Sequence, residues 1–313
     1  MHDGYDSMRG SVIATIAPYR GQARCASLRE SVPLRLIGPS HGTGGASGFF
    51  LLNTSGAVIG GDHLTTRITV ERGTALSIRT PGSTLLHPGG HTHLIEHLSL
   101  APDCYVEWLP GSFIPYAGAY IDHHWTANVH TGATLIVADH FLAGRLARGE
   151  AFQFTALRSL RRITYGSWPL YVEAQSLVPC RGQLSGWGPY TCQATLIVAG
   201  PHATVALADE LAALFEAPGS VPSPGDLHGN VGQESWQDVA DGQSRARGTP
   251  PASCQPSVVW GSASTLARNG VIARLLTTDP YESRRRLDLA IAVARRHVLL
   301  GSNTLVRSST TPK

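Results

Sequence analysis

The chain has 313 residues, and 25 Lys and Arg side chains against 22 Asp and Glu side chains leave a formal net charge of only +3. This balance, without a basic run interleaved with aromatic residues, argues against a nucleic-acid partner. No apolar run reaches the ~18 residues of a membrane span or has the form of a signal peptide. The five cysteines show no C-x-x-C spacing, which favours a reducing compartment. We expect a cytoplasmic protein without a membrane segment.

In chain order, the polar residues 1–13 are predicted to be disordered. From residue 62 to 141 a strand–turn–strand unit occurs three times, with turns at Gly73, Asp103 and Gly132 that lie 30 and 29 residues apart. A looser fourth copy is expected at 195–206, with its turn at Gly200. Alternation at a near-constant period is typical of stacked strands, because one unit alone cannot bury its apolar face. The pattern predicts an all-β fold with many strands, either two-layer or solenoid-like.

Two helices are expected to lie at the periphery of this sheet. Residues 207–216 carry apolar side chains at helical spacing, and a second helix is predicted from Asp279, with Pro280 at its first position, to about Leu300. Between them, residues 218–256 hold six prolines and six glycines and are predicted to be a disordered insertion or long loop. The whole chain, 1–313, is read as a single domain.

Four further motifs stand out. Gly60-Gly61-Asp62 places a carboxylate in a tight backbone setting, where it either bonds its own turn or meets a ligand or metal. Residues 109–119 carry two prolines around an apolar pair, which predicts a sheet edge or corner, or an exposed surface for a partner. Residues 144–150 form a turn with opposite charges, and residues 270–274 precede an arginine-rich helix.

Taken together and in this order, the four motifs resemble the UreD (also called UreH) family of urease accessory proteins, from about Ala14 to Arg307. The resemblance implies an all-β fold with two helices, a complex with UreF and the GTPase UreG, and delivery of nickel into apo-urease. Nickel would be in transit, with no tightly bound cofactor and no catalytic role. The chain departs from the family at residues 79–85, where Pro81 is expected to end or bend the strand.

The resemblance also points to carboxylates along a nickel path. Asp62, Asp139 and Glu173 are the candidates, with Glu150 as a weaker one. A delivery protein should hold nickel weakly, and spaced carboxylates suit that task. The alternatives are surface or turn carboxylates, and for Glu150 an ion pair with Arg145. His140 is placed beside Asp139 and is expected to assist it.

The densest group of imidazoles comprises His87, His91, His93 and His97, together with Glu96. His91, His93 and His97 are secondary metal candidates, because alternate strand positions share one face. Pro88-Gly89-Gly90 favours instead a flexible, solvated loop. In His123-His124 the two neighbours point to opposite faces of a strand, which argues against joint ligation.

No Ser-His-Asp, Cys-His or H-E-x-x-H arrangement can be found, so catalysis is not expected. Trp108, Phe113, Ile114 and Tyr116 are candidate anchors for a partner, with core packing as the alternative. Two competing functions remain open beside the accessory role. One is a metal-dependent enzyme that uses the His87–His97 cluster on a β scaffold, and the other is a β-sandwich binding module without metal chemistry.

Overall fold

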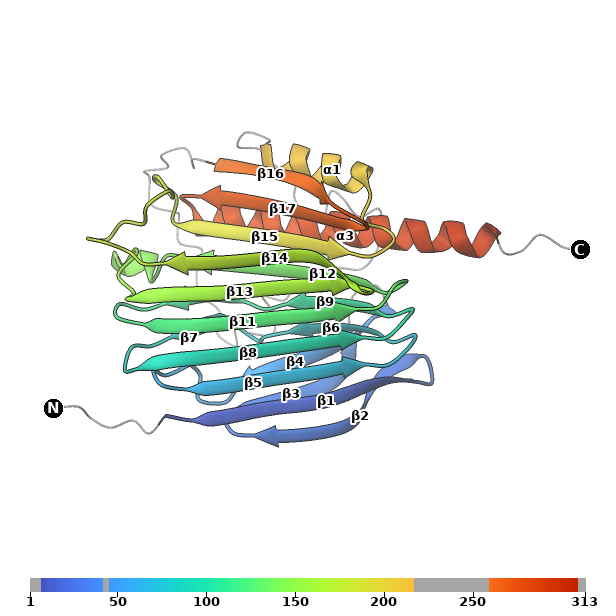
Figure 1. Ribbon diagram of the computed structural model, residues 1–313, viewed down its shortest axis with the longest axis horizontal. Helices are drawn as coiled ribbons and strands as arrows, with labels where there is room; N and C mark the ends of the chain where they lie inside the picture. The colour runs from blue at the N-terminus through green and yellow to red at the C-terminus, as the bar shows by residue number, and fades with distance from the viewer. Residues whose placement is uncertain (1–6, 42–44, 217–258, 309–313) are drawn as a thin grey trace, which may run out of the picture.

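The computed structural model describes residues 7–41, 45–216 and 259–308. The insertion predicted at 218–256 lies outside these ranges. Within them the chain forms two large sheets and two α-helices, which confirms the all-β expectation with two helices (Figure 1). The seven-stranded sheet contains, in spatial order, β14 (Trp168–Leu177), β13 (Ala156–Tyr165), β11 (Tyr120–Val129), β8 (His91–Leu100), β5 (His63–Val70), β1 (Arg9–Tyr19) and β2 (Gln22–Ser31).

The second sheet counts ten strands among the described residues. Two of them are short and lie off the main path: β7 (Thr84–Leu86) pairs with β10 (Ser112–Pro115), which also pairs with β12. The main path runs through β16 (Val259–Leu266), β17 (Gly270–Thr277), β15 (Cys192–Ala199), β12 (Thr134–Leu142), β9 (Tyr105–Leu109), β6 (Ala75–Arg79), β4 (Ser47–Asn53) and β3 (Leu34–His41).

The threefold repeat builds the middle of both sheets. β5, β8 and β11 lie side by side and parallel in the seven-stranded sheet, and β6, β9 and β12, which follow them, lie parallel in the ten-stranded sheet. At each predicted turn the backbone enters the left-handed region, with φ of 71° at Gly73, 61° at Asp103 and 87° at Gly132. The chain therefore winds through two stacked layers in the solenoid-like manner that its period predicts.

The fourth copy of the repeat was predicted wrongly. β15 is antiparallel to both β12 and β17, and after Gly200 the chain enters helix α1 (Val205–Glu216) instead of a strand. Every residue of β15 is buried, since one face meets the intersheet core and the other the helices. A strand buried on both faces reads as a continuous apolar run, and such a run carries no information about its direction.

Disorder over residues 1–13 was also wrong where β1 begins, at Arg9. β1 lies between β2 and β5, and its inward side chains, such as Val12 and Ile16, are fully buried. The alternate positions of β1 face outward and are partly or fully exposed. Ile13 is 45% exposed between the buried residues Val12 and Ala14, so an apolar side chain at an outward position breaks the apolar–polar alternation.

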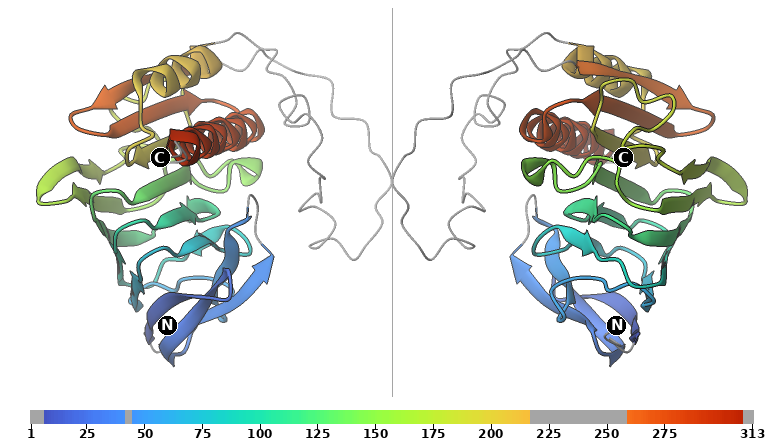
Figure 2. Two further views of the ribbon diagram at one scale, coloured as in Figure 1. Left: turned by 90° about the vertical axis from the view of Figure 1, so that its right-hand side faces the viewer. Right: turned by 90° about the vertical axis from the view of Figure 1, so that its left-hand side faces the viewer.

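Side chains pack in two cores that separate three layers. One core fills the space between the sheets, and the other lies between the ten-stranded sheet and the helices α1 and α3 (Pro280–Ser308). Figure 2 shows the arrangement of the sheets and helices. The predicted apolar face of α3 is buried through Leu287, Ile291, Ala294 and Val298. Among the described residues, no helix has the length and apolar character to span a membrane. Four described cysteines are free thiols: Cys25, Cys104, Cys180 and Cys192.

Two proline-containing segments make an irregular corner of the ten-stranded sheet. β6 ends at Arg79, so the strand stops before Pro81 as expected. The predicted corner at 109–119 contributes the four-residue β10. Gly111 lets the two segments touch, because a Cβ atom there would lie 2.1 Å from the carbonyl oxygen of Gly82. This corner leaves room between the sheets.

Candidate functional site

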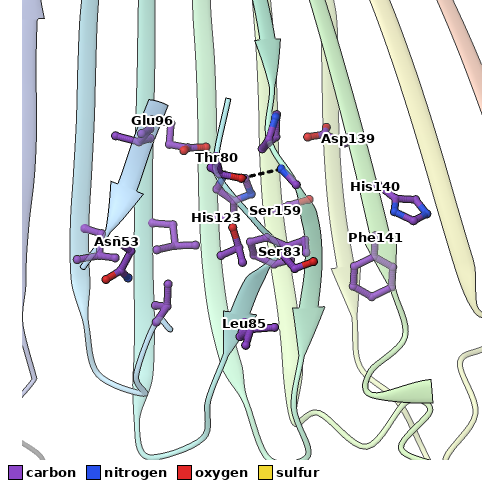
Figure 3. A pocket seen from close by; sticks show the side chains of 18 of the residues that line it. Asn53, Thr80, Ser83, Leu85, Glu96, His123, Asp139, His140, Phe141 and Ser159 are labelled. Carbon is purple, nitrogen blue, oxygen red and sulfur yellow. Dashed lines mark hydrogen bonds and ion pairs between the residues drawn. The ribbon is translucent and has the colours of Figure 1, made fainter. Parts of the chain in front are cut away.

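A cavity of about 450 Å³ lies between the two sheets beside this corner (Figure 3). Strands β5, β8, β11, β13 and β14 line it from the seven-stranded sheet, and strands β3, β4, β12 and β15 line it from the ten-stranded sheet. Residues 80–85 border it, together with Pro110, Gly111 and Phe113. Strand alternation selects the side chains that face it, because every second residue of each strand points toward the other sheet.

The charged group of the cavity centres on Arg161 of β13. Its guanidinium forms an ion pair with Asp139 of β12 and lies 3.8 Å from Oε2 of Glu173 on β14. Arg274 of β17 also pairs with Glu173 and donates a hydrogen bond to the hydroxyl of Tyr171 at 3.0 Å. Burial, followed by the negative charge of Glu173, raises the pKa of Tyr171 to about 12. Two of the predicted carboxylates, Asp139 and Glu173, therefore share the cavity and are neutralised by two guanidinium groups.

A second polar pair faces the same cavity. Nε2 of His123 on β11 lies 2.8 Å from Oε2 of Glu96 on β8. The ring of Phe113 stacks on His123, with 5.5 Å between centroids and 13° between planes. Figure 3 shows Glu96, His123 and Asp139 around the cavity. The imidazole of His123 and the carboxylates of Glu96, Asp139 and Glu173 are thus spaced along the cavity, which His140 also borders.

The side chain of His140 bonds a residue other than Asp139, its neighbour in the sequence. Consecutive strand residues point to opposite faces, and His140 bonds Ser112 through Nδ1 at 2.8 Å. Burial and, to a smaller extent, the positive charge of Arg284 on α3 lower the pKa of His140 to about 4. Within the described part of the chain its Nε2 atom has no hydrogen-bond partner. His140 is a buried, neutral imidazole.

Asp62 occupies the turn-bonding alternative that the sequence left open. Its carboxylate is fully buried, Oδ1 accepts the backbone N–H of Met8 at 2.8 Å, and Oδ2 accepts that of Ile59 at 2.9 Å. Asp62 does not belong to the cavity lining. The neighbouring Gly60 is packed on the next repeat, since a Cβ atom there would lie 2.4–2.6 Å from the backbone of residues 88–90. The motif aligns stacked turns.

Glu150 likewise takes its ion-pair alternative. Its carboxylate accepts two hydrogen bonds from Arg145, one of them 2.7 Å from Nε, and this contact lowers the pKa of Glu150. The pair closes a 3₁₀ turn, η2 (Leu146–Arg148), and the Arg145 guanidinium lies 4.1 Å from the ring centroid of Tyr116. Glu150 does not line the cavity.

The His87–His97 cluster does not assemble as one site. Residues 91–97 belong to β8 and are not a solvated loop, so that expectation was wrong. Glu96 faces the cavity, and the ring of His87 packs against Tyr116 with centroids 4.4 Å apart. The two nitrogens of His97 contact Thr126 and Ser99 hydroxyls. Only His91 and His93 come together, on the outer face with Asp122.

The four candidate partner anchors lie in different parts of the structure. Trp108 is 3% exposed and packs against Trp125 in the intersheet core, with 6.3 Å between centroids, which is its core-packing alternative. Phe113 lines the cavity, whereas Ile114 and Tyr116 are half-buried near the corner. The sequence did not predict that three of the charged or polar side chains face the cavity, those of Glu96, His123 and Arg161. The apolar inward neighbours Leu94 and Leu98 indicate that Glu96 faces inward, once β8 is recognised as a strand.

Comparison with known proteins identifies the family. A family model described as UreD urease accessory protein matches residues 8–309. A urease accessory protein UreD from Deinococcus radiodurans is 25% identical over 291 residues, which is 91% of this chain and 89% of that protein. Urease accessory protein UreD 2 from a Synechococcus strain is 38% identical over 37% of this chain and 43% of its own length. UreD from Ruegeria pomeroyi is 32% identical over 41% of this chain and 51% of its own length, so the chain spans about half of these two relatives. The chain belongs to the UreD family of urease accessory proteins.

Proposed function

We propose that the chain acts as a cytoplasmic, non-catalytic metallochaperone scaffold that binds apo-urease together with UreF and UreG and delivers nickel through the cavity between its sheets. One observation supports this most: Glu96, His123, Asp139 and Glu173 all face that cavity. Imidazole, carboxylate and water are ligands that Ni(II) accepts. Family membership supports the choice of partners, and the side chains of the cavity support the nickel route.

The guanidinium groups suit transit rather than storage. Asp139 and Glu173 are held by Arg161 and Arg274, so an entering cation must displace a positive charge before it gains a carboxylate. A guanidinium group in contact with a carboxylate lowers the attraction of that carboxylate for a further cation. The cavity therefore offers a series of weak oxygen and nitrogen ligands, from which nickel is released again.

The experiment is urease activation at limiting nickel with the purified chain, UreF, UreG and apo-urease. Asp139→Asn and Glu173→Gln keep side-chain volume and remove one charge each. We expect each to lower the rate of activation about tenfold while leaving the complex with UreF and apo-urease intact. Asp209→Asn, an exposed position on α1, is the matched control and should activate normally. Full activation by both cavity variants would refute the route.

A further inference from the structure

The outer face of the seven-stranded sheet carries an imidazole cluster that the intersheet cavity does not use. His63 on β5, His93 on β8 and Asp122 on β11 are register partners on three neighbouring parallel strands. His91 occupies the next outward position of β8, and its ring stacks on Tyr120 with centroids 4.0 Å apart. Because the strands fix all of these backbones, the side chains are brought together without a flexible loop.

The distances suit a metal ion. Nε2 of His91 lies 2.8 Å and Nδ1 of His93 lies 4.0 Å from Oδ2 of Asp122, and one ligand atom from each residue falls within 4.8 Å of the others. Ligands about 2.1 Å from an ion at right angles stand about 3 Å apart. The three side chains are 22–36% exposed, so small rotations can close the remaining gap.

Polar atoms in this cluster lack ordinary partners. The approach of His91 Nε2 to Asp122 does not have hydrogen-bond geometry, and Oδ1 of Asp122 is buried with no hydrogen-bond partner among the described residues. Arg158 is the register partner of Asp122 on β13, yet its guanidinium lies over the Tyr120 ring, 5.5 Å from the centroid. A buried carboxylate oxygen left open beside two imidazoles is what a missing cation would satisfy.

We propose that His91, His93 and Asp122 bind one divalent transition-metal ion of the borderline class, such as Ni(II) or Zn(II). Two imidazoles and one carboxylate suit that class, and the open positions are left for water or for His63, whose ring stacks on His93 at 4.5 Å. A shallow cavity of about 340 Å³, bordered by His63 and His93, gives access from solvent. The site is on the opposite face of the sheet from Glu96 and His123, and the inference does not rest on the nickel route through the cavity.

Equilibrium dialysis of the purified full chain against Ni(II) alone tests the proposal. Loss of an outer-sphere partner already costs about 10- to 100-fold in metal affinity, so His93→Ala and Asp122→Asn should each weaken one binding event at least tenfold. His130→Ala removes an exposed imidazole from a turn at the other end of the strands and should leave that event unchanged. Glu173→Gln alters the intersheet cavity, so this binding event should persist in that variant whatever happens to Ni(II) binding between the sheets.

The proposal is overturned if wild type shows no binding event beyond that of Asp122→Asn, or if His130→Ala lowers binding equally. Asp122→Asn keeps the volume of the side chain, and circular dichroism of each variant verifies the fold. With Cu(II) as a probe, electron paramagnetic resonance should show coupling to imidazole nitrogen that His91→Ala reduces. If coupling to imidazole nitrogen is absent, or is unchanged in His91→Ala, the metal does not bind at His91, His93 and Asp122.

Discussion

His140 gives the fold a measurable pH dependence. The side chain is 3% exposed, its Nδ1 atom contacts Ser112, and burial lowers its pKa from 6.5 to about 4. As pH falls, the unfolded chain takes up a proton at this position near pH 6.5, before the folded protein does. The stability that this neutral imidazole contributes is therefore complete above pH 6.5 and is lost as pH falls toward 4.

The magnitude follows from the same shift. A pKa lowered by about 2.5 units corresponds to about 3 kcal/mol, at 1.36 kcal/mol per unit. His140→Gln removes the titrating group and keeps a polar side chain near Ser112. The difference in unfolding free energy between wild type and variant, measured by urea denaturation from pH 4 to 8.5, should move by about 3 kcal/mol in favour of the variant as pH falls from 6.5 to 4.

The difference in unfolding free energy between wild type and His140→Gln cancels the titration of every group that the two proteins share. The range from pH 7.5 to 8.5 is an internal control, because there the imidazole is neutral in both the folded and the unfolded state. A difference that stays constant from pH 7 to pH 4 would show that His140 is not buried in the neutral form. Burial and the nearby charge of Arg284 would then not lower its pKa.

Three other substitutions test the packing and the charges. Gly60→Ala should lower the free energy of unfolding in urea by about 1–3 kcal/mol, because the added methyl group meets the backbone of the next turn. A methyl group added at Gly82 meets no atom within 4 Å, so Gly82→Ala should cost less than about 1 kcal/mol. Equal losses of stability in the two variants would contradict the close stacking of the turns at Gly60. Glu107→Gln should lower the free energy of unfolding by about 3–5 kcal/mol, because it breaks a buried ion pair with Arg295. Burial opposes the charge of the Glu107 carboxylate, but two hydrogen bonds from Arg295 keep its pKa lowered. A loss below about 1 kcal/mol would mean that the pair is not buried. Arg161→Met frees Asp139 and leaves Glu173 paired with Arg274 alone, so it should tighten Ni(II) binding in the cavity about tenfold, or about 1.4 kcal/mol. Calorimetry that shows unchanged or weaker binding would argue against neutralised carboxylates as the reason for weak affinity.

The repeat could be predicted because its signals are local. A polar or glycine turn at Gly73, Asp103 and Gly132, with alternating strands on either side, is visible in windows of about ten residues. The helix faces were predicted for the same reason. β15 and β1 were not predicted, because β15 is buried on both faces and β1 carries the apolar Ile13 at an exposed position. In both, the position in the sheet decides the pattern.

The cavity was only half predictable. Family resemblance brought Asp139 and Glu173 forward, but Arg161, which joins them, lies 22 and 12 residues away on a third strand. Pairing across strands is a tertiary property that the order of residues does not reveal. The proximity of His91 to Asp122 could not be predicted for the same reason, because the two residues lie on different strands. The prediction of a loop over the histidines also concealed the sheet face that they share.

The most direct test of the nickel route is to plug the cavity without changing its charge. Ser159 of β13 faces the cavity, whereas Arg162 on the same strand is exposed on the outer face. The measurement is nickel incorporated per urease after maturation with UreF, UreG and each variant. We expect Ser159→Phe to assemble the complex yet load about tenfold less nickel, and Arg162→Phe to load the normal amount. Normal loading by Ser159→Phe would mean that nickel does not pass between the sheets.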